Sequence, residues 1–350
     1  MPDILSGLNK EQKDAVTTIS GPILIIAGAG SGKTRALTHR IAYLIEQKIS
    51  PQNILALTFT NKAANEMRSR ICNLLGHGIE KSYNSHITKS GGFMGTFHAF
   101  AVKILRNEIP RLGRSRNFVI YDEKDSLSAV KDIMAELAID LNQFRAGGIA
   151  SAISSQKNEL KDAKTYNDSA KEFYEKLVGK VFTRYEEVLC ESNALDFDDL
   201  LLLAVRVFKK FPDALEKYQD QFKYILVDEY QDTNHAQYTL LNMLARKHKN
   251  LCVVGDDWQC FPANTKITTS SGLKPIEKIK RGEDVLSANG SGIISRKVEK
   301  TREYNYAGKL IKITTSDGHS IQTTPNHILF TKFSLKIDIY FVYLMYSMKY

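Results

Sequence analysis

The segment Ala27–Thr34 reads AGAGSGKT, a glycine-rich run that ends in a lysine and a hydroxyl residue. Glycines at this spacing let successive backbone N–H groups turn toward one anion, and the lysine can reach the outer phosphates of a nucleotide. The threonine hydroxyl can ligate Mg²⁺. The chemistry predicted for this segment is therefore the binding of a nucleoside triphosphate together with Mg²⁺.

The residues on either side of this loop supply the elements that would position it. GPILIIAG (21–28) has the length and branching of a buried strand, and RALTHRIAYLI (35–45) carries apolar residues at helical spacing. A strand, a loop and a helix in this order place the loop at a helix N-terminus, whose partial positive charge favours phosphate. A chance match to the glycine pattern would lack these flanks, so we interpret the segment as a P-loop.

A second apolar stretch, YILV (224–227), ends in Asp228 and Glu229. Beside a P-loop, one carboxylate at the end of a buried strand can hold Mg²⁺, and the next can orient and deprotonate the attacking water. We therefore assign Asp228 to the metal and Glu229 to the general base. A further strand, LCVV (251–254), leads into GDDWQ, in which Gln259 is placed to contact the γ-phosphate.

Two predicted turns carry residues suited to single-stranded nucleic acid, the first of them between a strand and a helix. The first follows ILALT (54–58), where Phe59 can stack on a base and Asn61 and Lys62 can reach the backbone. The second lies in GTFHAF (95–100), and the Gly-, Ser- and Asn-rich residues 76–92 before it predict a flexible loop. Taken alone, each turn is better explained by ordinary packing or a solvated lysine, so the nucleic-acid hypothesis depends on the wider pattern.

Bulk composition limits these interpretations. The 350 residues carry a net charge of +9, but residues 260–350 hold 14 Lys and Arg against 7 Asp and Glu, which leaves only +2 before them. Nucleic-acid binding by the first part must therefore come from the local placement of charge. The four cysteines form no CxxC pair, which indicates a reducing, cytoplasmic compartment without a zinc site. No run of about 18 apolar residues occurs, so no membrane span is expected.

Six segments occur in one order: LNKEQ (8–12), AGAGSGKT (27–34), TFTNKAA (58–64), TFHAF (96–100), VDEYQDTN (227–234) and VVGDDWQ (253–259). Together they resemble the N-terminal part of superfamily 1 DNA helicases of the UvrD/PcrA/Rep type, over residues 1–259. The resemblance implies an α/β, RecA-like parallel sheet with a helical insertion. It also implies ATP-driven 3′→5′ movement on single-stranded DNA, with Mg²⁺ as cofactor.

The resemblance also implies roles for single residues, and Gln12 would read the adenine. The residues expected at the nucleotide are Gln12, Ala27, Gly28, Ala29, Gly30, Ser31, Gly32, Lys33, Thr34 and Arg35, with Thr34 and Asp228 at the metal and Glu229 and Gln259 at the reacting phosphate. The segments expected along the DNA path contain Phe59, Asn61, Lys62, Phe97 and His98. One departure is Trp258, which stands where the family usually has a third acidic residue.

The second departure comes after Gln259, where the family continues with Ser-Ile-Tyr and this chain has Cys260. CFPANTKI (260–267) and TTPNH (323–327) resemble the N-terminal part of an intein, an all-β Hint fold. The Cys260 thiol would attack the Gln259 carbonyl to form a thioester, while Thr324 and His327 assist the departing amide. Asp317-Gly318 between alternating segments predicts a hairpin.

The predicted domains are a RecA-like core (1–109 and 196–259), a helical insertion (110–195) that ends before Asp196 as a helix N-cap, and a truncated intein segment (260–350). No His-Asn dipeptide follows Cys260, and the aromatic tail carries no clear period or splice block. The chain is therefore interpreted as half of a split intein, with a second polypeptide as partner, or as a truncated frame.

Two other functions stay open at this point. The chain could be a nucleotide-switched single-strand DNA binder without turnover, because nothing after Gln259 resembles the second RecA-like domain of a helicase. It could also be a self-processing protein whose only surviving chemistry lies at Cys260. DNA-stimulated ATP hydrolysis would separate the first from a helicase, and reaction with thiols would reveal the second.

Overall fold

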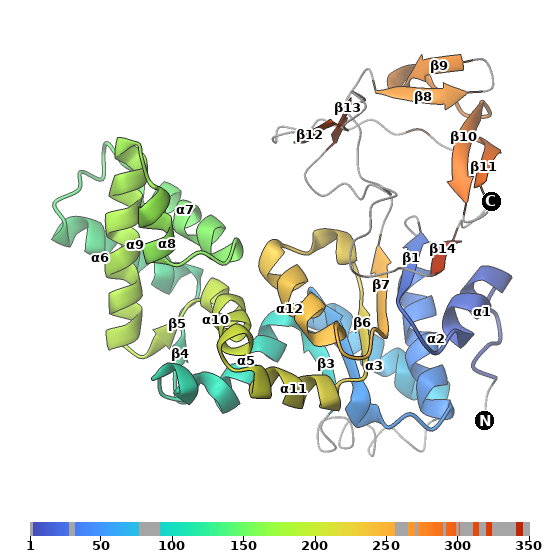
Figure 1. Cartoon of the computed structure of the whole chain (residues 1–350), viewed down its shortest axis with the longest axis horizontal. Coiled ribbons are helices and arrows are strands. Elements are labelled where there is room, and N and C mark those ends of the chain that lie inside the picture. Colours follow the sequence, from blue (N-terminus) through green and yellow to red (C-terminus); the bar gives the residue numbers. More distant parts are fainter. Residues whose placement is uncertain are drawn as a thin grey trace. The chain divides into compact units, whose positions relative to one another are not determined.

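The computed structural model describes residues 3–27, 32–76, 92–255, 265–269, 272–289, 292–298, 301, 311–314, 320–323 and 341–345 (Figure 1). These residues form two compact units. Unit 1 consists mainly of Leu44–Leu226 and Thr233–Leu251. Unit 2 consists of Asp3–Tyr43, Val227–Asp232 and the chain from Cys252 onward.

A six-stranded sheet has the strand order β14-β1-β7-β6-β2-β3. Its strands are β1 (Ile23–Ala27), β2 (Ile54–Thr58), β3 (Phe93–Thr96), β6 (Tyr224–Val227), β7 (Leu251–Gly255) and β14 (Phe341–Met345). β1 pairs in parallel with β7 and β14, and β2 pairs in parallel with β3. All five residues of β2 are buried. A parallel strand is covered on both faces, which explains why its sequence is a nearly continuous apolar run. The structure thus confirms the predicted α/β class with a parallel sheet.

Unit 2 contains the helix α1 (Lys10–Thr17) and most of α2 (Lys33–Glu46). Asn9 caps α1 in a capping box with Gln12, which fixes where the helix begins. The buried guanidinium of Arg40 on α2 donates to the carbonyl oxygens of Ala15 at 2.9 Å and of Thr18. These bonds satisfy carbonyl groups at the end of α1 and hold that helix against α2.

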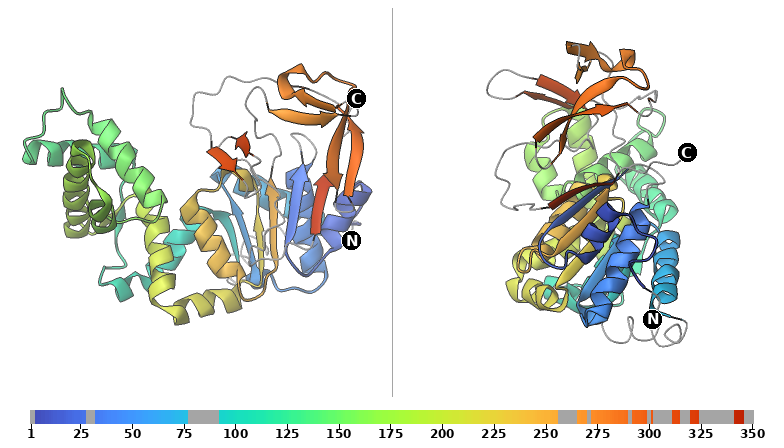
Figure 2. Two further views of the ribbon diagram at one scale, coloured as in Figure 1. Left: turned by 45° about the horizontal axis from the view of Figure 1, so that its top comes forward. Right: turned by 90° about the vertical axis from the view of Figure 1, so that its right-hand side faces the viewer.

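The C-terminal strands of unit 2 are mostly antiparallel. β8 (Lys266–Thr269), β9 (Gly272–Pro275), β10 (Asp284–Asn289) and β11 (Gly292–Lys297) form a sheet in the order β11-β10-β8-β9. β12 (Ile311–Thr314) pairs antiparallel with β13 (Ser320–Thr323), which confirms the predicted hairpin. In the tail, expected to lack a pattern, β14 instead lies beside β1 (Figure 2).

Unit 1 is mainly helical. Its helices are α3 (Asn61–Leu75), α5 (Phe97–Glu108), α6 (Glu123–Glu136), α7 (Ala146–Asn158), α8 (Ala163–Ser169), α9 (Phe173–Glu191), α10 (Phe197–Lys210), α11 (Pro212–Gln221) and α12 (His235–Ala245). The short strands β4 (Val119–Ile120) and β5 (Ala194–Leu195) pair in parallel. Asp196 is the N-cap of α10, as the sequence predicts, and its side chain accepts a hydrogen bond from the Asp199 N–H.

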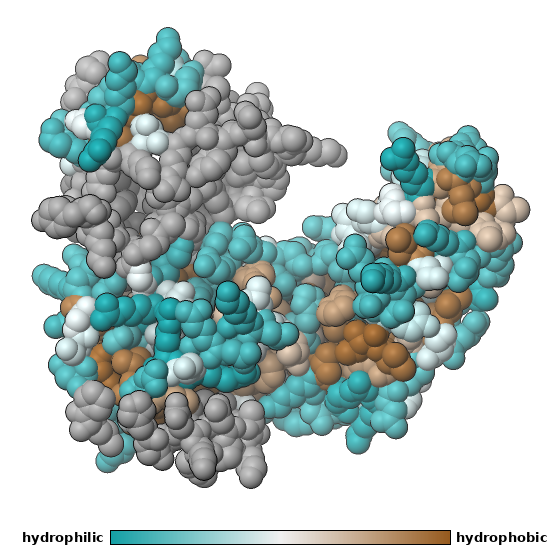
Figure 3. Space-filling model, turned by 180° about the vertical axis from the view of Figure 1, so that it is seen from behind, coloured by the Kyte–Doolittle hydropathy of each residue, from teal (hydrophilic) through white to brown (hydrophobic). Residues whose placement is uncertain are grey.

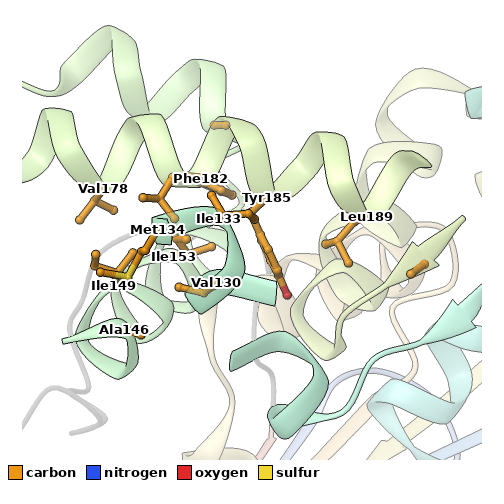
Figure 4. Packing of buried hydrophobic residues seen from close by; sticks show 13 residues of the cluster. Val130, Ile133, Met134, Ala146, Ile149, Ile153, Val178, Phe182, Tyr185 and Leu189 are labelled. Carbon is orange, nitrogen blue, oxygen red and sulfur yellow. The ribbon is translucent and has the colours of Figure 1, made fainter. Parts of the chain in front are cut away.

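Helices α6 to α9, drawn in green in Figure 1, enclose a hydrophobic core of their own (Figure 4). It includes Val130, Ile133 and Met134 of α6, Ile149 and Ile153 of α7, and Val178 and Phe182 of α9. Their spacing of three and four residues places them on one face of each helix. The helical character predicted for residues 110–195 is therefore confirmed, while the bounds of a separate domain stay a prediction.

On the face drawn in Figure 3 the described surface is mostly polar, with apolar patches that include some on the helical part. The exposed apolar side chains of this part include Phe173 at 74%, Val119 at 58%, Phe197 at 50% and Leu141 at 47%. Among the described residues no helix is long and apolar enough to cross a membrane. Of the described cysteines, Cys72 and Cys252 are buried and Cys190 is exposed, and all three are free thiols.

Candidate nucleotide-binding site and nucleic-acid-facing turns

The start of α2 and the end of β6 bring together two residues predicted to hold a metal ion. The Thr34 hydroxyl donates a hydrogen bond to Asp228 Oδ2 at 3.0 Å, although the residues lie 194 positions apart in the chain. Lys33, the first residue of α2, is only 8% exposed. All three residues belong to unit 2, so one compact part of the chain contains the hydroxyl, the carboxylate and the ammonium group.

The electrostatics of Asp228 fit a cation site. The side chain is 3% exposed, and burial raises its pKa, as does the neighbouring charge of Glu229. The hydrogen bond from Thr34 and the charge of Lys33 oppose this rise without cancelling it. A buried carboxylate of this kind is stabilised as an anion by a nearby cation. Thr34 and Asp228 therefore suit Mg²⁺, which prefers oxygen ligands and takes its other ligands from phosphates and water.

Glu229 adopts a backbone conformation that is uncommon for residues other than glycine. Its φ is +51°, in the left-handed region. Its Oε2 accepts a hydrogen bond from Gln231 Nε2 at 2.7 Å, and its backbone N–H donates to Asp228 Oδ1 at 3.1 Å. A Cβ added to Gly255, at the end of β7, would lie 3.3 Å from Gln231 Oε1. The two acidic side chains thus have different hydrogen-bond partners.

Gln12 lies directly against the described end of the P-loop. The side chain is 6% exposed, and a Cβ added to Gly32 would lie 2.9 Å from Gln12 Nε2. Gly32 has a φ of +88°, which disfavours any residue with a Cβ. A surface glutamine on a short helix would have been unremarkable, but this one is buried beside the loop. Arg35 is exposed, and its guanidinium lies close to Gly7.

Several predicted site residues lie outside the described part of the chain. Of Ala27 only the backbone is described, at the end of β1. The residues outside it are Gly28, Ala29, Gly30, Ser31, Trp258, Gln259, Cys260, Thr324 and His327. The loop predicted at 76–92 also lies outside it, apart from its first and last residues. The roles of all these residues stay predictions.

The two turns predicted to face nucleic acid both belong to unit 1. Asn61 and Lys62 are exposed in the first turn of α3, which Thr60 caps. Phe59 is half-buried, and its ring centroid lies 5.5 Å from that of Phe97. Phe97 itself is 1% exposed, so its ring packs in the core and supports Phe59. The DNA-facing role of the segment that contains Phe97 stays a prediction, and the other residues keep side chains at or near the surface.

The His98 side chain is half-buried and lies next to Phe197, an aromatic residue that is not among the predicted site residues. Burial lowers the pKa of His98, and the charge of Asp198 opposes this. Its ring meets that of Phe197 edge-on at 5.7 Å, and Phe197 is 50% exposed. The sequence LDFDDLLLL (195–203) indicates only the start of an apolar helix. The available signal was a large apolar residue directly after the N-cap, off the buried stripe of α10.

These features define a P-loop nucleotide-binding domain. They are the parallel sheet, the helix α2 that begins at Lys33, and the hydrogen bond from Thr34 to the buried Asp228 at the end of β6. Comparison with known proteins places the chain more narrowly. The sequence model of the UvrD/REP helicase N-terminal domain matches residues 8–261, and the chain belongs to this family.

Two relatives show how far this likeness extends. The proteins named ATP-dependent DNA helicase PcrA from Staphylococcus epidermidis (strain ATCC 12228 / FDA PCI 1200) and Staphylococcus aureus (strain NCTC 8325 / PS 47) are each 48% identical to this chain over 260 residues. That stretch is 74% of this chain and 34% of each relative. The chain thus spans about a third of the length of the curated relatives it matches, and residues 262–350 lie beyond the family match.

Proposed function

We propose that this chain is the ATP-binding N-terminal part of an ATP-dependent DNA helicase that moves 3′→5′ on single-stranded DNA. The observation that carries the proposal is the hydrogen bond between Thr34 and Asp228 within a family-matched P-loop domain. Lys33 and the P-loop backbone bind the phosphates, and Gln12 pairs with the adenine. Thr34 and Asp228 hold Mg²⁺, which neutralises phosphate charge when bound. Glu229 orients the attacking water and accepts its proton.

Nucleotide binding is tested by titrating the 350-residue chain with a fluorescent ATP analogue in the presence of Mg²⁺. Lys33→Ala should abolish binding, while Lys13→Ala, which removes an exposed lysine from α1, should leave it unchanged. Hydrolysis by the 350-residue chain should be slow, and the chain should not unwind duplex DNA. The proposed reason is that arginines of a second RecA-like domain would contact the γ-phosphate, and such arginines raise the rate of related phosphoryl transfers by roughly 10³–10⁵. Robust unwinding by this chain would contradict the proposal that it needs a second half.

The proposed DNA contacts are those of the exposed turns in unit 1. Lys62 and Asn61 are placed to meet the backbone, and Phe59, His98 and Phe197 to meet bases. A second candidate function is a nucleotide-switched binder without turnover, for which the same nucleotide site and the same exposed turns would suffice. DNA-stimulated release of phosphate above the rate of Lys33→Ala decides for an enzyme, and binding without such stimulation decides for the switch.

We also propose that residues 260–350 are the N-terminal part of an intein, in a cytoplasmic protein that is spliced with a second polypeptide. Two observations support this: the family match ends next to Cys260, and the described strands β8 to β13 are antiparallel. The Cys260 sulfur bonds to the Gln259 carbonyl carbon, the peptide C–N bond breaks, and the amine leaves with a proton supplied through His327. The products are a thioester and a free amine.

Mass spectrometry of the chain treated with dithiothreitol tests this second proposal. The added thiol should release a fragment that ends at Gln259, faster when a matching C-terminal intein half is present. Cys260→Ala should stop the release, and Cys190→Ala, which removes an exposed thiol elsewhere, should not. If no such fragment forms under either condition, Cys260 is not an intein nucleophile.

A further inference from the structure

Asn158, the last residue of α7, contacts the N-terminal ends of two other helices in unit 1. Its Nδ2 donates a hydrogen bond to Asp198 Oδ1, in the first turn of α10, at 2.9 Å. Its Oδ1 accepts a hydrogen bond from Nδ2 of Asn234, the N-cap of α12, at 2.5 Å. One amide side chain therefore ties the insertion helix α7 to both α10 and α12.

The chemistry of the three side chains requires a central group that both donates and accepts, and the Asn158 amide does both. An ionised Asp198 only accepts hydrogen bonds, and the Asn234 NH₂ group only donates. The bridging side chain must therefore donate on one side and accept on the other. Leucine at position 158 would remove the hydrogen bonds to Asp198 and from the Asn234 NH₂ group, and aspartate would face Asp198 with a second carboxylate. Burial raises the pKa of Asp198, so this carboxylate depends on the donors around it.

Both partners of Asn158 belong to functional segments. The charge of Asp198 acts on His98, and Phe197, the residue before it, packs edge-on against the His98 ring. Asn234 ends the segment VDEYQDTN and lies five residues after Glu229 in the sequence. It caps α12 by accepting a hydrogen bond from the Gln237 N–H at 2.9 Å. The contacts of Asn158 thus reach the proposed DNA-facing turn and the end of the proposed hydrolysis motif.

We propose that Asn158 is a positioning residue for single-stranded DNA binding. It holds Asp198 in place beside His98 and Phe197, and it anchors this arrangement to the N-terminus of α12. The inference rests on the proposed DNA-binding function of unit 1. It extends that function to the helical insertion, which contributes through Asn158 without touching DNA.

The test measures the affinity of the 350-residue chain for a fluorescent oligothymidylate by anisotropy. Asn158→Asp and Asn158→Leu should each weaken DNA binding by roughly tenfold, the usual size of one lost hydrogen bond to a charged group. Affinity for the fluorescent ATP analogue should stay within about twofold of wild type. Asn142→Asp is the matched control, because it adds the same charge at an exposed position in the insertion.

A reciprocal exchange separates positioning from general damage to the fold. In Asn158→Asp/Asp198→Asn the new amide at 198 donates to the new carboxylate at 158, which still accepts from Asn234. DNA affinity should return to within about twofold of wild type, and should do so even if Asn158→Asp alone folds poorly. The inference is overturned if Asn158→Asp binds DNA like wild type, or if the folded exchange variant shows no recovery. If the wild-type chain binds nucleotide but no DNA, the proposed DNA function fails, and the inference falls with it.

Discussion

Replacement of Lys157 by methionine should destabilise unit 1 more than any exposed charge change. The Lys157 side chain is fully buried, and its Nζ lies 2.7 Å from Asp196 Oδ2 and 2.8 Å from Asp199 Oδ1. Burial alone would lower the pKa of Lys157, but the two carboxylates outweigh it and hold that pKa above its usual value. Methionine removes the cation and leaves two buried carboxylates, which costs about 3–5 kcal/mol. Urea unfolding at fixed pH measures this loss.

The loss should depend on pH. Burial raises the pKa of Asp199 even with Lys157 present, and without the ammonium group the rise must be larger. The folded variant then binds more protons than its unfolded chain, so its stability falls as pH rises through that window. The difference from wild type should therefore be smaller at pH 5 than at pH 8.

Two further variants decide whether the buried charges are the cause. Lys164→Met removes an exposed lysine from the same insertion and should change stability by no more than about 0.5 kcal/mol. Adding Asp196→Asn and Asp199→Asn to Lys157→Met removes the unpaired charges and should restore most of the loss. A Lys157→Met chain within about 1 kcal/mol of wild type at pH 8 would refute the argument, as would a triple variant no more stable than the single one.

Three other outcomes follow from the site geometry. Asp228→Asn should stabilise the nucleotide-free chain by about 1 kcal/mol, because burial disfavours the carboxylate, and thermal unfolding measures this gain. The same variant should lose the Mg²⁺ dependence of nucleotide affinity, which titration with and without Mg²⁺ measures. Gly32→Ala should weaken nucleotide binding at least about tenfold through its contact with Gln12, whereas Gly21→Ala, with a similar φ of +90° and open space, should not. DNA binding should have a log–log salt slope shallower than about −4, because few phosphates are neutralised and each contributes roughly −0.7.

Strands β1, β2, β6 and β7 of the parallel sheet were predictable because buried strands are apolar runs in the sequence, whereas no strand was predicted at β3. The run ILALT forms β2 with the same residues, since a strand covered on both faces is a nearly continuous apolar run. β14 was not predictable in this way. Its segment lies in a long aromatic tail, where apolar residues are frequent and no turn signal marks the ends of a strand.

The candidate site likewise has some contacts that were predictable from the sequence and others that were not. The pairing of Thr34 with Asp228 was predictable, because both belong to segments whose spacing is set by phosphate and metal chemistry. The burial of Phe97 and the exposure of Phe197 were not, because a single aromatic residue is equally suited to a core or to a stacking surface. The hydrogen bond from Asn158 to Asp198 joins two common polar residues that lie 40 positions apart, so no local sequence pattern predicts it.

The backbone at Glu229 accounts for how adjacent acidic residues can do different work. A left-handed conformation costs a residue with a Cβ of order 1–3 kcal/mol and persists only where its surroundings fix it. Here the Glu229 N–H is bonded to Asp228 and its carboxylate to Gln231, while the absence of a side chain at Gly255 leaves space for that glutamine. Asp228 stays directed at Thr34. The strained turn therefore directs the Asp228 carboxylate, proposed to hold Mg²⁺, at Thr34 and the Glu229 carboxylate, proposed as the general base, at Gln231, although the two residues follow each other in the chain.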